Sequence, residues 1–198
     1  MQSAISSQPG LTHTSATLPA SVTGRIVLAV AATALVAACA HVSLPLPFTP
    51  VPLTLQNFAV LLVGMVLGPV AGFSAMILYL AEGAMGLPVF NPQGPGGIAQ
   101  LLGPTAGYLF AYPLAAAAAG WVVRSMRQVG SAFTRGVVAG IAFSVILFAL
   151  GAGWLATVLH LSAPAAWHLA VAPFLLGEVI KVTAAAAAFS TIQRWRQS

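Results

Sequence analysis

Charged side chains are scarce in this chain: they make up 5% of its 198 residues, and only two of them are acidic. A soluble domain carries about 25% charged residues, so a soluble globular fold is excluded. Hydrophobic residues make up 59% of the chain. Because a membrane-spanning helix needs about 20 apolar residues, the length allows roughly six or seven spans. The composition therefore predicts one all-α, polytopic membrane domain.

Other absences narrow the function. Cys39 is the only cysteine, so no internal disulfide can form. The G-x-x-x-x-G-K-[ST] loop that binds nucleotide phosphates is absent, so we expect no ATP hydrolysis by this chain. A membrane-embedded hydrolase would need a nucleophile with a base, and no span contains a His-based active-site motif. The sequence thus predicts no catalytic residue, no cofactor and, because its arginines are scattered at helix ends, no nucleic-acid partner.

The chain divides into a short tail and one membrane domain. Residues 1–23 are small and polar without periodicity, which predicts a disordered tail. No cationic segment precedes an apolar run there, so a cleaved signal peptide is not expected. Residues 24–195 form the domain, with six transmembrane helices predicted at about 26–44, 53–67, 70–87, 108–123, 136–159 and 165–192. Pro173 either kinks the last helix or lies in its true first turn.

Two connections differ from ordinary water-exposed loops. Residues 45–52 contain four prolines, which forbid a helix, yet the segment is also apolar. Irregular backbone at membrane depth is tolerated where protein buries it or where it lines a cavity. We therefore expect a loop folded back over one end of the protein. Residues 91–97 are rich in glycine and proline, which permits close approach to a ligand, and Asn91 and Gln93 supply donors and acceptors.

The arginines orient the six predicted helices. All six fall at the ends that share a side with both termini, namely Arg25, Arg124, Arg127, Arg135, Arg194 and Arg196. By the positive-inside rule this side is the cytoplasm. The proline-rich loop, residues 91–97 and the start of the sixth helix then converge on the outer face. This convergence predicts a pocket that opens outward, with capping loops over it.

The sixth helix carries one of the two acids and the single lysine. Glu178 and Lys181 are three residues apart, so both side chains lie on one helix face. A charged side chain in hydrocarbon costs about 2.5–3.5 kcal/mol, and such residues usually face a partner or a cavity. One interpretation is a ligand site and the other is a structural pair that neutralises itself. Gln56 and Asn57, in the first turn of the second helix, are placed to line the same recess.

Six motifs follow one another along the chain: PVPLTLQN (50–57), LGP (67–69), GLPVF (86–90), GG (96–97), LGPTAGY (102–108) and GEVIK (177–181). Together they resemble the BioY family of biotin-capturing substrate-binding (S) components of energy-coupling-factor (ECF) transporters. The resemblance covers residues 24–195. Three positions depart from the family pattern: Glu178 replaces an aspartate, Ala106 a glycine, and Pro95 an asparagine. The resemblance implies six membrane helices with the substrate held near the outer side, under the first and third loops.

The resemblance also implies ligand contacts and partners. Biotin carries a ureido group with two N–H donors and a carbonyl acceptor, and its tail ends in a carboxylate. Glu178 can accept from a ureido N–H while Lys181 donates to a ligand oxygen. The remaining expected contacts are Gln56, Asn91, Gln93, Phe90 and Tyr108. Partners implied are a transmembrane coupling subunit and two ATPase subunits in a bacterial inner membrane. Ala34 and Ala38 on the first helix are the expected docking face.

Three alternatives stay open at this point. Some relatives are thought to transport without a dedicated ATPase module, which leaves a stand-alone carrier possible. A proton-coupled carrier would use Glu178 as its relay. Metal uptake would draw on His41, His160 and His168, because histidine is a common metal ligand. These histidines lie at predicted helix ends, where histidine is ordinarily solvated, so no metal site is expected.

Overall fold

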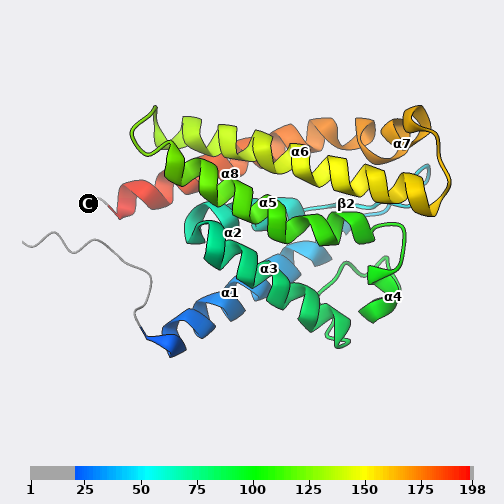
Figure 1. The fold of residues 1–198 in the computed structure, drawn as a ribbon, viewed down its shortest axis with the longest axis horizontal. Helices are drawn as coiled ribbons and strands as arrows, with labels where there is room; N and C mark the ends of the chain where they lie inside the picture. Colours follow the sequence, from blue (N-terminus) through cyan, green and yellow to red (C-terminus); the bar gives the residue numbers. More distant parts are fainter. Residues whose placement is uncertain (1–20, 197–198) are drawn as a thin grey trace, which may run out of the picture.

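A computed structural model describes residues 21–196, so residues 1–20 of the expected tail lie outside the described part of the chain. Helices that run alternately between two ends of the molecule build the fold (Figure 1). They are α1 (Val22–His41), α2 (Gln56–Leu67), α3 (Pro69–Ala84), α5 (Ala106–Ser125), α6 (Ala132–Val158) and α8 (Leu175–Trp195). The predicted all-α class is confirmed.

In the described part of the chain, four stretches are long and apolar enough to cross a membrane: α1, α5, α6 and the segment Ala163–Trp195 that ends in α8. The helices α2 and α3 are also apolar, but they have 12 and 16 residues. At 1.5 Å per residue, these two helices are only about 18 and 24 Å long, shorter than the roughly 30 Å hydrocarbon core.

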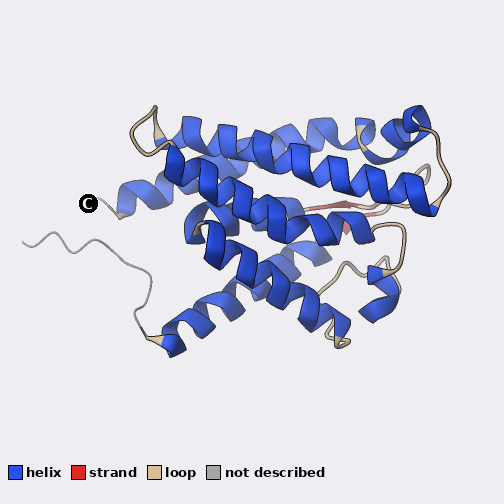
Figure 2. Ribbon diagram, viewed as in Figure 1, coloured by secondary structure: helices blue, strands red, loops and turns tan. Residues whose placement is uncertain are grey.

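The shorter elements gather at the end of the molecule opposite the termini (Figures 1 and 2). They are α4 (Gly97–Leu101), α7 (Ala163–Ala170), the 3-10 turn η1 (Ala172–Phe174), and the strands β1 (Ser43–Leu44) and β2 (Leu53–Thr54). The strands pair antiparallel, with Ser43 opposite Thr54 and Leu44 opposite Leu53. The four prolines lie in the loop between the strands, residues 45–52, which contains no helix or strand, as predicted. The two flanking strands close this loop into a hairpin.

The prediction of one continuous sixth helix from residue 165 to 192 is wrong. The structure divides this region into α7, η1 and α8. Pro173 lies in η1, directly before α8, where its missing N–H costs no helical hydrogen bond. The alternative that places Pro173 at the true start of the helix is therefore the one the structure supports. Glu178 and Lys181 consequently lie near the first turn of α8.

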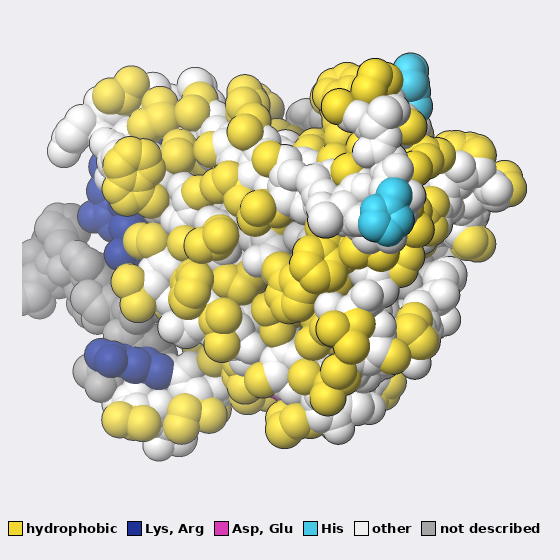
Figure 3. All heavy atoms as spheres, turned by 45° about the vertical axis from the view of Figure 1, so that its right-hand side comes forward, with side chains coloured by type: hydrophobic (Ala, Val, Ile, Leu, Met, Phe, Trp, Pro, Cys, Tyr) yellow, Lys and Arg dark blue, Asp and Glu magenta, His cyan; other side chains and the backbone are white. Residues whose placement is uncertain are grey.

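The end that holds the chain termini is also the basic end. Arg25 lies in the first turn of α1, Arg135 in the first turn of α6, and Arg124 and Arg194 in the last turns of α5 and α8. Figure 3 shows Lys and Arg side chains gathered at the left, while hydrophobic side chains cover most of the remaining visible surface. The arginines thus gather at one end, as the sequence predicts.

The helix α5 lies at the centre of the packing and contacts α2, α3 and α6. Small residues on its buried face let it approach α2 closely. A Cβ atom at Gly120 would lie 2.5 Å from the Gly68 carbonyl carbon and 2.7 Å from the Gly64 carbonyl oxygen. Gly68 itself has φ +86°, and Pro69 then begins α3. This backbone-to-backbone contact fixes the α2–α3 turn against α5.

We expect Gly120→Val to destabilise the protein by about 1–3 kcal/mol, because the neighbouring atoms are backbone and have little freedom to move. The matched control is Gly153→Ala on α6, where an added Cβ meets nothing within 4 Å. Thermal unfolding in detergent should show a lower midpoint for Gly120→Val and an unchanged or higher one for Gly153→Ala. Equal midpoints for the two variants would contradict the close packing of α5 on α2.

Candidate ligand-binding site

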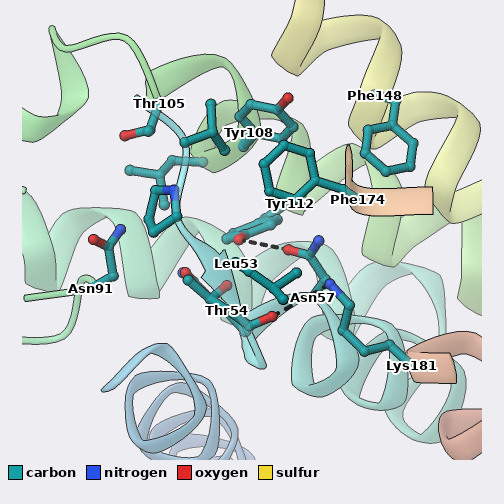
Figure 4. Close-up of a pocket in the computed structure, with 14 residues that line it drawn as sticks. Leu53, Thr54, Asn57, Asn91, Thr105, Tyr108, Tyr112, Phe148, Phe174 and Lys181 are labelled. Atoms are coloured by element: carbon teal, nitrogen blue, oxygen red, sulfur yellow. Dashed lines mark hydrogen bonds between the residues drawn. The ribbon is translucent and has the colours of Figure 1, made fainter. Parts of the chain in front are cut away.

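A cavity lies beneath the β1–β2 hairpin at the end opposite the termini (Figure 4). It encloses about 480 Å³ of space between protein atoms, part of it open to solvent. The residues that line it are Val51, Pro52, Leu53, Thr54, Gln56, Asn57, Asn91, Thr105, Tyr108, Leu109, Tyr112, Phe148, Phe174 and Lys181.

Aromatic rings form one wall of the cavity (Figure 4). Tyr108 and Tyr112 are four residues apart on α5 and so project from the same helix face. Phe148 comes from α6 and Phe174 from η1. The Tyr108 hydroxyl donates to the Ala170 carbonyl oxygen at the end of α7, which fixes this ring against the broken helix. The wall offers flat apolar surfaces to a ring-shaped ligand.

A buried ion pair lies beside the cavity. Lys181 Nζ is 2.9 Å from Glu178 Oε2, and both residues are buried. Lys181 also donates to the Thr54 carbonyl oxygen of β2 at 3.4 Å, which links α8 to the hairpin (Figure 4). Lys181 lines the cavity. Glu178 does not line it, and is linked to the cavity by its ion pair with Lys181. Direct contact of Glu178 with a ligand stays a prediction.

Two amide side chains predicted to contact a ligand, Gln56 and Asn91, line the cavity and differ in their hydrogen bonds. Gln56 is engaged, because its Nε2 donates to the Tyr79 hydroxyl at 2.8 Å. Tyr79 in turn donates to the Val89 carbonyl oxygen at 2.6 Å. Asn91 is buried, and within residues 21–196 its Oδ1 has no hydrogen-bond partner. A buried acceptor without a partner is costly, and contact of Asn91 with a ligand stays a prediction.

The other two predicted contacts lie outside the cavity lining. Phe90 is buried, and its ring packs edge-on against Tyr79 with centroids 5.5 Å apart. Gln93 is exposed, and its Oε1 accepts a hydrogen bond from Ser43 Oγ in β1. Phe90 therefore supports the wall behind Gln56, and Gln93 joins the third loop to the hairpin.

The remaining predicted residues are on the outside. Ala34 and Ala38 are exposed on α1 and, being four residues apart, share a face of that helix. His41 at the end of α1 contacts the Ala37 carbonyl oxygen at 2.8 Å. Within residues 21–196, no group of three or more His, Cys, Asp or Glu side chains is placed to hold a metal ion.

The structure brings in residues that the sequence did not single out. Tyr112 and Phe148 line the cavity, and Ser144 donates to Glu178 Oε1 at 3.0 Å. The sequence could have pointed to Tyr112, since it lies one helical turn after Tyr108. It could not have pointed to Ser144, because the distance of Ser144 from Glu178 depends on how α6 packs on α8.

The sequence of this chain matches that of a known protein family over most of its length. The family model described as "BioY family" matches residues 9–198. The chain belongs to the BioY family. Among curated BioY proteins, "Biotin transporter BioY" of Rhodobacter capsulatus is 37% identical over 164 residues, which cover 79% of this chain and 85% of that protein. The "Probable biotin transporter BioY" of Pyrococcus horikoshii is 55% identical over 71 residues, or 36% of this chain and 43% of that protein.

Other BioY matches are also partial. "Biotin transporter BioY" of Thermotoga maritima is 50% identical over 84 residues, which cover 42% of this chain and 48% of that protein. The matched stretches thus span less than half the length of several curated BioY relatives. The fold matches a crystal structure of the S-component for biotin from an ECF-type ABC transporter. The TM-score is 0.79 with 23% identity, over 87% of this chain and 92% of that one.

Proposed function

We propose that this chain captures biotin at the outer side of the cytoplasmic membrane and serves as the S component of an ECF-type transporter. The observation that carries the proposal is the match to the Rhodobacter capsulatus biotin transporter over 85% of that protein's length. The cavity supports it, because it combines an aromatic wall, a lysine and an amide oxygen without a partner in the described chain. A transporter of this kind carries its ligand unchanged and is not an enzyme.

The lining groups match the chemistry of biotin. The fused rings pack on Tyr108 and its aromatic neighbours, and Asn91 Oδ1 accepts from a ureido N–H. Lys181 donates a charge-assisted hydrogen bond to a ligand oxygen, which is stronger than a neutral one. Gln56 extends this polar edge, whereas Phe90 and Gln93 act through the elements they hold in place. Glu178 supplies the matching negative charge, so the pair adds no net charge to the site.

We further propose that the protein crosses the membrane six times. The short helices α2 and α3 complete their crossings together with the non-helical backbone beside them, namely the β1–β2 hairpin and the loop before α4. Both segments contribute residues to the cavity lining, and irregular backbone at membrane depth is tolerated where it lines a cavity. The arginines at the terminal end support a cytoplasmic location of both termini, by the positive-inside rule. The cavity then opens on the outer side of the bacterial inner membrane, where it meets extracytoplasmic biotin.

Energy for uptake comes, in this proposal, from a transmembrane coupling subunit and two ATPase subunits. The test is uptake of radiolabelled biotin by cells that lack their own biotin transporter and express this chain with a coupling module. Uptake should require ATPase subunits with intact Walker motifs. Uptake that survives loss of all ATPase partners would point to a stand-alone carrier. If that uptake also collapses with the proton gradient, a proton-coupled carrier is favoured.

Gly151→Ala is expected to weaken biotin binding by about 10-fold. A Cβ atom at Gly151 on α6 would overlap the Tyr108 ring and push it into the cavity. Overpacking of this kind costs about 1–3 kcal/mol, part of which appears as lost affinity. Gly153→Ala, two residues further on the same helix and open to added atoms, is the control and should bind normally. Equal affinities would remove Tyr108 from the proposed site.

A further inference from the structure

We infer that Ser144, Asn57 and Tyr112 are positioning residues that hold the Glu178 carboxylate as the fixed counter-ion of Lys181. This inference rests on the proposed biotin site and assigns roles within it. The three residues come from α6, α2 and α5, while the ion pair is on α8. The helices α2 and α6 therefore contact this carboxylate of α8 directly, and α5 contacts it through Asn57. The packing of the four helices decides where the ligand-facing ammonium group lies.

Both oxygens of Glu178 are engaged. Oε1 accepts from Ser144 Oγ at 3.0 Å, and Oε2 accepts from Asn57 Nδ2 at 3.2 Å as well as from Lys181 Nζ at 2.9 Å. A carboxylate offers about four acceptor positions, so three of them are filled. Glu178 is 3% exposed and does not line the cavity. Its anionic charge is thus held by protein donors in the ligand-free protein.

The orientation of Asn57 is itself fixed. The Tyr112 hydroxyl donates to Asn57 Oδ1 at 3.1 Å (Figure 4). Since this contact takes the oxygen end of the amide, the Asn57 Nδ2 group is turned towards Glu178. Tyr112 is 2% exposed and comes from the aromatic wall of the cavity. The wall that packs on the ligand rings therefore also sets the position of the counter-ion.

The network leaves Lys181 with a defined task. An ammonium group has three donors. Within residues 21–196, two of them have acceptors, Glu178 Oε2 at 2.9 Å and the Thr54 carbonyl oxygen at 3.4 Å. The third is left for a ligand oxygen in the cavity that Lys181 lines. Loosening Glu178 would let Lys181 move, because the carboxylate is its shortest contact.

Ser144 provides the cleanest test, because it does not line the cavity and cannot contact the ligand there. We expect Ser144→Ala to weaken biotin binding about 10-fold in calorimetric titration of the detergent-purified protein, since a hydrogen bond to a charged group is lost. Ser144→Thr keeps a hydroxyl and should restore most of the affinity. The matched control is Thr157→Ala on the same helix, whose hydroxyl is exposed and bonds only to the Gly153 carbonyl oxygen.

The comparison separates positioning from general stability. Both ligand-free variants should still unfold cooperatively, while only Ser144→Ala loses biotin affinity. If the parent binds biotin, two results would overturn this inference but not the proposed function. One is that Ser144→Ala binds biotin as well as the parent, and the other is that Ser144→Thr binds it as weakly as Ser144→Ala. A folded parent that does not bind biotin would overturn the proposed function together with it.

Discussion

Replacing Lys181 by Met is expected to weaken biotin binding by at least about 30-fold. The variant removes the donor that faces the cavity and leaves the buried Glu178 carboxylate without its cation. Truncating one member of a buried charge pair costs about 2–5 kcal/mol in binding, and each 1.4 kcal/mol is a factor of ten. Calorimetric titration of biotin into the purified variant measures the loss. Glu178→Gln should weaken binding too, since it frees Lys181 to move.

A double variant, Glu178→Gln with Lys181→Met, separates the two interpretations of the pair. A purely structural pair can be replaced by neutral groups at little cost, because neither charge is then left unpaired. The double variant would in that case bind biotin like the parent. If Lys181 contacts the ligand, the double variant stays as weak as Lys181→Met. Recovery of full affinity would reduce the pair to structure while leaving biotin as the ligand.

Tryptophan at both Ala34 and Ala38 is expected to abolish coupled biotin uptake while leaving biotin binding intact. Both alanines are exposed on one face of α1, and neither lines the cavity. Small residues let two helices approach closely, so two large rings would hold a coupling subunit away. Radiolabelled biotin uptake by cells that express the complete transporter measures the first effect, and titration of the purified variant measures the second.

The matched control for this variant carries tryptophan at Val145 and Ala149. These residues are also exposed and four apart, but they lie on α6, at the opposite edge of the molecule from α1 in Figure 1. Uptake should persist in the control. Uptake by the α1 variant at the parent rate would remove α1 as the docking face. Loss of biotin binding in the α1 variant would instead show that this face supports the cavity.

The fold class and the charged pair were predictable from sequence because charged residues are rare in membrane-spanning segments, so the few that occur there stand out. With only two acids and one lysine in 198 residues, a Glu178–Lys181 spacing of three indicated one polar face. Helix ends were harder to predict. Ser21 caps α1 through its side chain, with Gly24 N donating at 3.1 Å, so the helix begins before the apolar run does. The break before α8 required a choice between two roles for Pro173.

The environment of the pair was not predictable, because it depends on tertiary packing. Ser144 lies 34 residues from Glu178 and Asn57 lies 121 residues from it, and no periodicity joins them. Phe90 illustrates the reverse case. Its aromatic character and loop position suggest a ligand contact, whereas in the structure its ring packs on Tyr79, outside the cavity lining. Local pattern therefore supplied candidate residues, and helix packing decides which of them line the cavity.

Calorimetric titration of biotin into the detergent-purified parent protein tests the central claim most directly. The account predicts saturable binding with one biotin per chain, which excess unlabelled biotin displaces in a parallel radioligand assay. Absence of binding by a parent that elutes as a single folded species and unfolds cooperatively would contradict the account. The cavity beneath the β1–β2 hairpin would then belong to a different small molecule.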